Sequence, residues 1–252
     1  MLFLRSLLFN ILYVTSVGPF ALLVALLAPL DRRIGIALAK AWIHLVLWSL
    51  KYICGIDWKI EGRENIPAEP SIAYWKHQSA WETLAQLIVF PAKQSWVLKR
   101  ELMWIPLIGQ ALMAIKPIPI NRKSGHTAVN QVLSIGTERL QKDGMWIMIF
   151  PEGTRMPPGT TRRYGLSGAL LAEKTGRPII PVAHNAGDFW RRKAFLKYPG
   201  TVQVRIGKPV YAKGRKPEAV NAEIQSWIET QMREISPGYE GRMLEKSPNK
   251  AF

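Results

Sequence analysis

Residues 71–90 read SIAYWKHQSAWETLAQLIVF, and the change of period within this stretch decides the fold class. Residues 71–76 form a short run suited to a buried strand, whereas residues 80–90 repeat apolar side chains at helical spacing. The alternation continues along the chain, with strand-like runs at 56–61, 95–98, 118–120, 145–150, 179–183 and 201–206 and helical runs at 127–142, 168–174 and 217–235. We therefore expect an α/β fold with a central mixed, largely parallel sheet flanked by helices.

The chain divides into three predicted parts around this sheet. Residues 1–54 are predicted to form a hydrophobic, membrane-binding helical region, residues 55–235 the α/β domain, and residues 236–252 a polar, flexible tail. The length of 252 residues suits one domain with an appendage. A composition of 48% hydrophobic and 21% charged residues excludes a disordered basic chain, because it supplies enough apolar surface for a core.

The chain is strongly basic, with 34 Lys and Arg against 18 Asp and Glu and a formal net charge of +16. Such an excess attracts an anionic partner, which can be nucleic acid, a membrane surface or a phosphorylated substrate. We expect no nucleic acid, because the sequence holds no recognised binding motif and its cations are spread along the chain. The single cysteine, Cys54, excludes a disulfide framework and multi-thiolate metal sites, and no metal site is predicted.

Residues 7–30 carry no charged side chain. As a helix of 24 residues, at about 1.5 Å per residue, this run would reach roughly 36 Å, which is enough to cross a bilayer. Gly18-Pro19 interrupts its middle, so a kinked or re-entrant helix pair is the alternative to a straight span. A cleavable signal peptide is a third interpretation, although no small-residue cleavage site follows the run.

Residues 34–50 form a second apolar stretch with a narrow basic stripe. At about 100° per residue, the side chains of Arg33, Lys40, His44 and Lys51 fall within about 40° of one another. This pattern is typical of a helix that lies flat in the membrane interface, and a buried core helix with one polar edge is the alternative. We expect a membrane-associated protein on the cytoplasmic face of the inner (plasma) membrane.

His77 and Glu82 lie where the strand at residues 71–76 gives way to the helix, and α/β proteins place reactive groups at such strand ends. If Ser79 caps the helix, the chain doubles back and the Glu82 carboxylate approaches the His77 imidazole. A carboxylate on one ring nitrogen makes the other nitrogen more basic, which predicts a general base for a hydroxyl group. The alternative is structural, because Ser79 and Glu82 also have the spacing of a capping box.

A second cluster, Phe-Pro-Glu-Gly-Thr-Arg at residues 150–155, directly follows a predicted apolar strand. Thr154, Arg155 and the backbone N–H groups released by Gly153 are suited to a phosphate or oxyanion cradle. The alternative is a surface turn in which Arg155 forms a salt bridge.

Together with further motifs, the two clusters resemble those of the glycerolipid acyltransferase family, the 1-acyl-glycerol-3-phosphate acyltransferases. The likeness spans most of residues 55–210. The first motif of the family is a His and an acid with four residues between them. The second is a spaced Lys, Leu, Pro and Gly, followed by an apolar strand that ends in Arg. The third corresponds to residues 150–155 of this chain, and the fourth is an apolar strand with an internal Pro. This chain matches these motifs in order with His77 and Glu82; Lys99, Leu102, Pro106 and Gly109; Arg122; residues 150–155; and residues 179–182.

The resemblance implies an acyltransferase domain at residues 55–235 that acts directly, with no covalent acyl enzyme and no cofactor. It would move a fatty acyl group from acyl carrier protein (acyl-ACP) or coenzyme A (acyl-CoA) to the sn-2 hydroxyl of lysophosphatidate, giving phosphatidate. His77 would be the base and Glu82 would orient it. The substrate-binding residues would be Lys99, Arg122, Glu152, Gly153, Thr154 and Arg155, with the three cations on the acceptor's phosphate. Membrane phospholipids would be further partners.

Two positions depart from the family's pattern. The usual acid is Asp, and Glu82 is one methylene longer. A Lys often found in a Tyr-Lys-x-Gly setting is replaced by Gly165, so another lyso-lipid acceptor is an alternative. A noncatalytic lipid-binding relative is a second alternative, if Glu82 only caps its helix. A serine esterase is excluded, because no acid and His follow Ser167 in the triad order that it needs.

Overall fold

The computed structural model of the chain describes residues 1–121 and 124–244. Its centre is a seven-stranded sheet with the order β1-β8-β7-β2-β5-β3-β4. The strands are β1 (Ile56–Glu61), β2 (Ile72–Trp75), β3 (Gln94–Lys99), β4 (Ile118–Ile120), β5 (Trp146–Ile149), β7 (Ile179–His184) and β8 (Gly200–Ile206). All neighbouring strands run parallel except β7 and β8, which run antiparallel. The predicted mixed, largely parallel sheet is confirmed.

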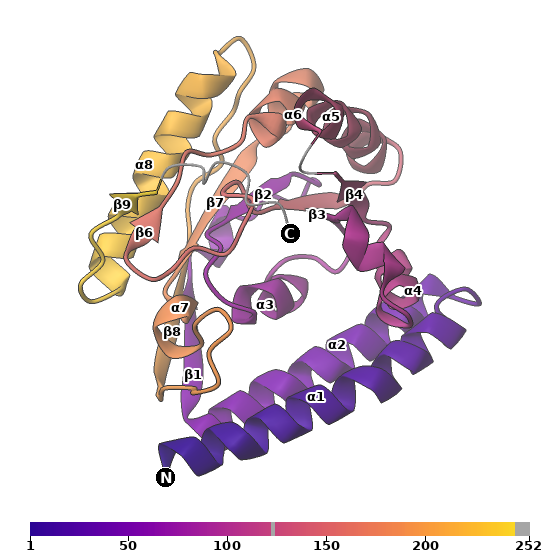
Figure 1. Cartoon of the computed structure of the whole chain (residues 1–252). Helices are drawn as coiled ribbons and strands as arrows, with labels where there is room; N and C mark the ends of the chain where they lie inside the picture. The colour runs from indigo at the N-terminus through magenta and orange to yellow at the C-terminus, as the bar shows by residue number, and fades with distance from the viewer. Residues whose placement is uncertain (122–123, 245–252) are drawn as a thin grey trace.

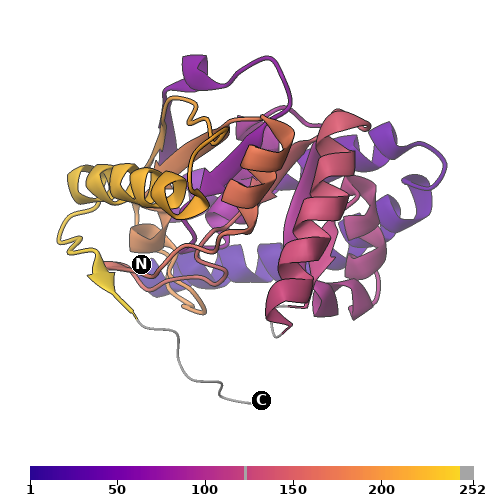
Figure 2. The same cartoon turned by 90° about the horizontal axis from the view of Figure 1, so that it is seen from above.

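Helices cover both faces of this sheet and make a three-layer fold (Figures 1 and 2). One face is covered by α5 (Gly125–Gln141), α6 (Ser167–Thr175) and α8 (Pro217–Ile235). The other face is covered by α3 (Trp81–Val89) and α7 (Ala186–Phe189), together with α1 (Leu2–Leu27) and α2 (Arg32–Ser49). The short helix α4 (Ile108–Leu112) packs against α1.

The central strand β2 shows why its sequence needs helices on both sides. Ile72 and Tyr74 point into the core beneath α5, α6 and α8, whereas Ala73 and Trp75 point into the core beneath α1, α2 and α3. Alternate side chains of a strand face opposite sides of the sheet, so a strand covered on both sides is apolar throughout. The helix α6 approaches this strand closely because Gly168 has no side chain, and a Cβ there would lie 2.3 Å from the Tyr74 ring.

The long apolar run near the N-terminus is one continuous helix. α1 passes through Gly18 and Pro19 without ending, so the predicted alternative of a break into two helices at this point is wrong. A short turn then leads into α2, which lies beside α1 (Figure 1). Both helices are long and apolar enough to cross a membrane, which indicates membrane association.

One face of α1 is apolar and exposed. Leu4, Leu8, Ile11, Leu22 and Leu26 are exposed, and their spacing places them in one stripe along the helix. The opposite side is buried, because Phe9 belongs to the same core as Trp75. The helical region thus packs on the α/β part of the chain while it presents an apolar surface outward.

The predicted basic stripe of α2 is only partly exposed. The side chains of Arg33 and His44 are exposed, whereas Lys40 is half-buried. Lys51 lies beyond the end of α2 and forms an ion pair with Asp57 at 2.9 Å. This pair reduces the charge that the stripe offers to an anionic surface.

Part of the predicted tail, residues 236–252, packs against the α/β domain. Ser236 is buried and its hydroxyl donates to Asp188 at 2.8 Å. Tyr239 is also buried, and β9 (Arg242–Met243) pairs with β6 (Thr160–Thr161) in a small second sheet. The remainder of the predicted tail, residues 245–252, lies outside the described residues.

Candidate active site

Three neighbouring strands bring their functional groups to one edge of the sheet. The strands β7, β2 and β5 are adjacent and parallel, so their carboxyl ends meet. His77 follows β2, the 150–155 turn follows β5, and His184 is the last residue of β7. The topology therefore brings together the two clusters that the sequence predicted to act in one site.

The Glu82 carboxylate holds both the His77 ring and the start of α3. Its Oε1 lies 2.9 Å from His77 Nδ1 and accepts the backbone N–H groups of Gln78 at 2.8 Å and Ser79 at 2.7 Å. The Ser79 hydroxyl accepts the N–H of Trp81 at 3.1 Å. The N-cap residue of α3 is Ala80, which has no side-chain cap, so the predicted capping by Ser79 is not found. The Glu82 carboxylate instead holds the turn before α3 through the same oxygen that contacts the His77 ring. With the Nδ1 proton directed at Glu82, the basic lone pair of the ring lies on Nε2.

The surroundings of Glu82 favour its charged form. Burial alone raises the pKa of this carboxyl, but His184, the hydrogen bond from His77 and the Ser79 N–H outweigh it, and the pKa lies below its ordinary value. His184 Nε2 donates to the Lys76 carbonyl at 2.7 Å and lies 4.0 Å from Glu82 Oε2. Burial lowers the pKa of His184, and the charge of Glu82 opposes that shift. The Glu82 carboxylate therefore lies between two imidazole rings and directly contacts that of His77.

Contacts on several sides fix the His77 residue. Its ring stacks on Phe150 with centroids 3.9 Å apart and planes 16° apart. Its backbone N–H donates to Glu152 Oε2 at 2.9 Å, and its carbonyl accepts the N–H of Met156 at 2.7 Å. The ring keeps 8% exposure, so it is held at the edge of the core.

A buried ion cluster lies directly beneath His77. The Lys76 ammonium donates to Glu152 Oε1 at 2.7 Å, to Glu229 Oε1 at 3.0 Å and to the Thr160 carbonyl at 3.1 Å. The Tyr239 hydroxyl donates to Glu229 Oε2 at 2.5 Å. Two carboxylates thus face one ammonium inside the protein, and burial raises the pKa of Glu152 to about 7.

This cluster gives Glu152 a different role from the predicted one and adds to the candidate site residues that the sequence did not predict. The Glu152 side chain is buried against Lys76 and the His77 backbone, so any contribution to a phosphate site is indirect. Lys76, His184, Glu229 and Tyr239 were not predicted as site residues. A lysine at the end of a buried strand was a signal for Lys76, but its partner Glu229 lies on a surface-like helix far along the chain.

Arg155 belongs to the turn at residues 150–155, and one of its side-chain donors has no hydrogen-bond partner among the described residues. Gly153 has a φ of +69°, which lets the chain turn sharply after Glu152. Within the described ranges, the buried Nε of Arg155 has no hydrogen-bond partner. Thr154 stands beside it and is half-buried. An arginine with a buried, unpaired donor at a strand end suits an anion, and the predicted alternative of an Arg155 salt bridge does not form among these residues.

Of the two remaining predicted cations, Lys99 lies further along the sheet. Lys99 ends β3, which is separated from β2 by β5, and its ammonium lies 3.4 Å from Glu101 Oε1. Arg122 lies outside the described residues. The structure thus brings His77, Glu82 and residues 152–155 together and leaves Lys99 at one side.

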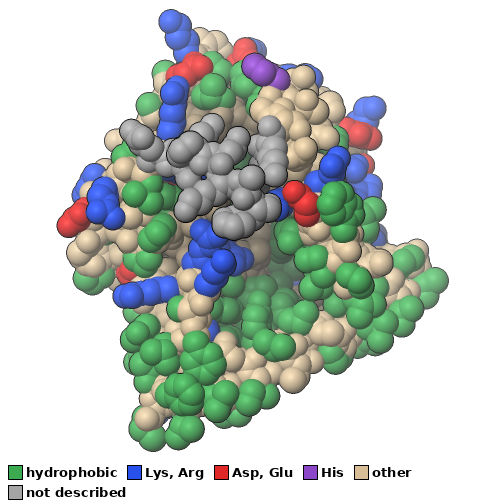
Figure 3. All heavy atoms as spheres, viewed as in Figure 1, with side chains coloured by type: hydrophobic (Ala, Val, Ile, Leu, Met, Phe, Trp, Pro, Cys, Tyr) green, Lys and Arg blue, Asp and Glu red, His purple; other side chains and the backbone are tan. Residues whose placement is uncertain are grey.

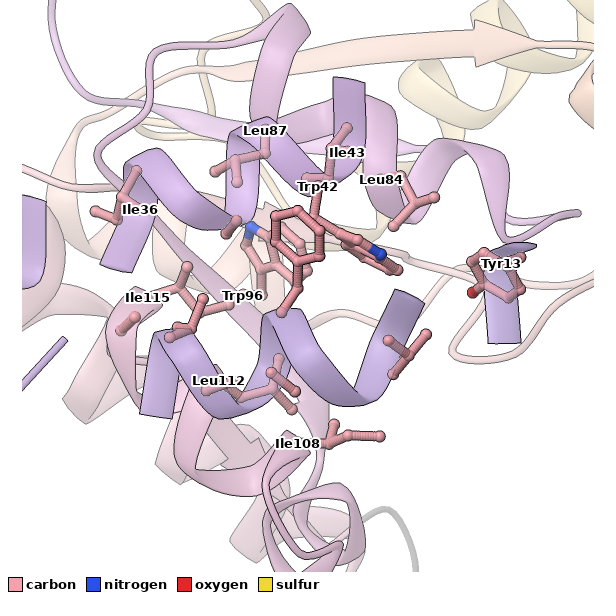
Figure 4. A pocket seen from close by; sticks show the side chains of 17 residues that line it. Tyr13, Ile36, Trp42, Ile43, Leu84, Leu87, Trp96, Ile108, Leu112 and Ile115 are labelled. Carbon is pink, nitrogen blue, oxygen red and sulfur yellow. The ribbon is translucent and has the colours of Figure 1, made fainter. Parts of the chain in front are cut away.

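An apolar cavity of about 290 Å³ lies between the α1–α2 pair, α3 and α4 (Figure 4). Tyr13 and Trp42 come from α1 and α2, Leu84 and Leu87 from α3, and Trp96 from β3. Among the described residues, its lining holds no charged side chain. Figure 3 shows a hollow with a hydrophobic floor and Lys and Arg side chains near its rim. The molecule therefore offers apolar space beside the helix that carries Glu82.

Comparisons with known proteins agree on one family. The acyltransferase family model matches residues 57–185. A 1-acyl-sn-glycerol-3-phosphate acyltransferase of Pseudomonas aeruginosa is 39% identical over 240 residues, which cover 93% of this chain and 92% of that protein. The alpha form of Homo sapiens is 30% identical over 199 residues, 77% of this chain and 70% of that protein.

A solved structure shows the same fold. The 1-acyl-sn-glycerophosphate (LPA) acyltransferase of Thermotoga maritima is 21% identical, with a TM-score of 0.70 over 94% of this chain and 96% of that one. The match of the family model and the full-length likeness to named enzymes remove the noncatalytic alternative. The chain therefore belongs to the acyltransferase family and is an acyltransferase.

Proposed function

We propose that this enzyme transfers a fatty acyl group from an acyl thioester, carried by acyl carrier protein or coenzyme A, to the free sn-2 hydroxyl of 1-acyl-glycerol-3-phosphate. The product is phosphatidate. The names of the relatives support this acceptor. The observation that carries the mechanism is the contact of 2.9 Å between His77 Nδ1 and a buried Glu82, beside the turn that presents Arg155.

In the proposed reaction, His77 acts as a general base in a single displacement. Nε2 takes the proton of the sn-2 hydroxyl as its oxygen forms a bond to the thioester carbonyl carbon. Collapse of the tetrahedral intermediate breaks the carbon–sulfur bond, and the thiolate takes the proton from the imidazolium. Glu82 stabilises that cation and fixes the ring, so neither a covalent acyl enzyme nor a cofactor is needed.

Binding of the acceptor's phosphate is assigned to Arg155, with Lys99 and Arg122 as further cations. Arg155 has the geometric support, since its buried Nε lacks a partner within the described part of the chain. A guanidinium can bind two phosphate oxygens at once and so orient the hydroxyl as well as attract the substrate. Thr154 and the Gly153 turn would shape the same pocket.

The apolar cavity beside α3 would take a fatty acyl chain, because its lining is apolar. The exposed stripe of α1 would lie in the cytoplasmic leaflet of the inner membrane, where both lipid and acyl donor are available. The net charge of +16 and the single buried cysteine are consistent with an anionic membrane surface in a reducing compartment.

The central test is the substitution His77→Ala in purified protein supplied with lysophosphatidate and an acyl thioester. Loss of the base should lower kcat by roughly 10²- to 10⁴-fold, the range usual for general acid–base catalysis. His126→Ala is the matched control, because His126 is exposed at the start of α5. Phosphatidate formation is measured by mass spectrometry of extracted lipids.

Two results would contradict the proposal. Turnover by His77→Ala equal to that of the wild type would remove the base mechanism. Faster acylation of a lyso-lipid with a larger head group than of lysophosphatidate would instead favour the alternative acceptor.

A further inference from the structure

The segment between α7 and β8 presents three consecutive cations at the catalytic edge. Arg191, Arg192 and Lys193 are all exposed. Among the described residues, none of these three cations forms an ion pair. The Arg191 guanidinium lies over the Tyr198 ring, 5.6 Å from its centroid, and its charge also acts on the Asp188 carboxyl. We call residues 191–193 the basic loop.

Buried contacts hold the basic loop in a defined place. The ammonium of the buried Lys197 donates to Asn10 Oδ1 at 3.0 Å and to the carbonyls of Ala194 at 3.1 Å and Phe195 at 2.8 Å. The backbone N–H of Lys197 donates to the Ser6 hydroxyl at 2.9 Å. The segment is therefore fastened to α1, and its cations need little further ordering to bind an anion.

One contact places the basic loop next to the turn at residues 150–155, which we call the catalytic turn because it follows β5 beside His77. Arg192 Nη1 donates to the carbonyl of Arg155 at 3.3 Å. The charge of Arg155 in turn acts on Tyr13, which lines the apolar cavity. The loop, the proposed acceptor site and the cavity thus border one another.

The proposed reaction must accommodate two phosphorylated substrates. Lysophosphatidate carries one phosphate, and both candidate acyl donors carry another on their phosphopantetheine arm. That arm separates the thioester from its phosphate. With the thioester at His77, the donor's phosphate therefore binds at the far end of the arm, at a site separate from that of the acceptor's phosphate. Arg155 is already assigned to the acceptor.

We propose that the basic loop binds the phosphopantetheine phosphate of the acyl donor, an inference that rests on the proposed function. Arg191, Arg192 and Lys193 supply the charge, and their position next to Arg155 directs the thioester toward His77. The loop's contact with the catalytic turn favours this ligand over a membrane lipid headgroup, for which no such contact is needed.

The test uses the double variant Arg191→Gln/Lys193→Gln, because neither side chain has a hydrogen bond to the catalytic turn. Three donors with the same acyl chain are compared: acyl-CoA, acyl-ACP and the acyl thioester of N-acetylcysteamine, which has no phosphate. We expect the KM for a phosphopantetheine donor to rise by about tenfold or more, since charge-assisted hydrogen bonds are lost. The kcat/KM with the phosphate-free donor and the KM for lysophosphatidate should stay within about twofold of the wild type.

The matched control is Lys174→Gln/Lys213→Gln, which removes the same charge from exposed positions on α6 and before α8. It should leave all three donors unchanged. A rise in KM for acyl-CoA alone or acyl-ACP alone would overturn the proposal, because the two donors share the phosphopantetheine phosphate, and would assign the loop to the adenosine phosphates or to the surface of the carrier protein.

Two further results would overturn the proposal while the wild type still forms phosphatidate. One is an equal loss with all three donors, which would place the loop in folding or in the acceptor site. The other is unchanged donor KM with weaker binding to phosphatidylglycerol vesicles, which would assign the loop to the membrane. A wild type that is inactive with every donor would instead refute the proposed function, and this inference with it.

Discussion

Glu82 shows how one side chain can serve structure and chemistry together. Its Oε1 accepts from the Gln78 and Ser79 N–H groups and from the His77 ring. The longer acid is accommodated because α3 begins immediately after the turn that holds His77. The contacts with the turn before α3 therefore fix the carboxylate that the proposed base at His77 requires.

The substitution Glu82→Gln separates charge from geometry. The amide oxygen can still accept the two backbone N–H groups, so the melting temperature should change little. The lost charge should lower the pKa of His77, reduce kcat by at least about tenfold and move the acid limb of the pH–rate profile to lower pH. Glu82→Asp is the control that keeps the charge. An unchanged pH–rate profile in Glu82→Gln would mean that the carboxylate only holds the turn before α3.

Glu152 should make stability depend on pH in an unusual direction. Burial raises the pKa of this carboxyl to about 7, above its value in the unfolded chain. Between about pH 4.5 and 7 the folded protein therefore keeps a proton that the unfolded chain has lost, and the free energy of unfolding falls as pH rises. When unfolding by denaturant is measured across this pH range, the free energy of unfolding should fall less steeply with pH in Glu152→Gln than in the wild type. Identical slopes would show that the carboxyl titrates normally.

At the scale of elements, most of the sheet and its helices could be predicted, because their patterns are local. The predicted ranges for β4 and α8 agree with Ile118–Ile120 and Pro217–Ile235. The continuity of α1 through Pro19 could not be predicted, since it depends on partners elsewhere. Trp42 of α2 donates to the Ser16 hydroxyl at 3.0 Å, and the Tyr13 ring meets Trp190 with centroids 5.4 Å apart.

The candidate site follows the same rule. His77 and Glu82 could be predicted, because they lie five residues apart at a strand-to-helix junction. The contact of Lys76 with Glu229 joins residues 153 positions apart, and no local pattern indicates it. The basic loop was likewise hidden within a general excess of cations.

The cavity between α1, α2 and α3 should set the acyl chain that the enzyme accepts. Ala39 lies in its lining, so Ala39→Phe fills space that a long chain would occupy. Each methylene that loses its buried place costs about 0.8 kcal/mol, so the preferred chain should become shorter. Competition among saturated donors of different length measures the shift. Ala41→Phe, on the exposed face of the same helix, should leave the preference unchanged; a parallel shift in both variants would contradict this role.

At the scale of the whole molecule, the N-terminal helices are part of the core as well as the membrane-facing surface. Phe9, Ile43 and Leu50 are buried in one cluster with Trp75 and Trp146 of the sheet. Removal of these helices would expose that face of the sheet to water. The membrane surface and the catalytic edge are thus joined by one continuous packing.

Deletion of residues 1–54 should therefore abolish cooperative unfolding and increase binding of a hydrophobic dye. The surface variant Leu8→Gln/Ile11→Gln changes only exposed positions of α1 and should keep the melting temperature while it weakens binding to anionic vesicles. A deletion protein with a sharp thermal transition would show that the α/β part folds without the helices.

The ion pair between Lys76 and Glu229 joins distant parts of the chain, so it can form only late in biosynthesis. Ribosomes release α1 and α2 first, whereas Glu229 and the Tyr239 that supports it are among the last described residues to emerge. The nascent polypeptide thus exposes its apolar helices long before the buried ion cluster beneath His77 can form. These helices are thus available to a membrane before the contacts beneath His77 are complete.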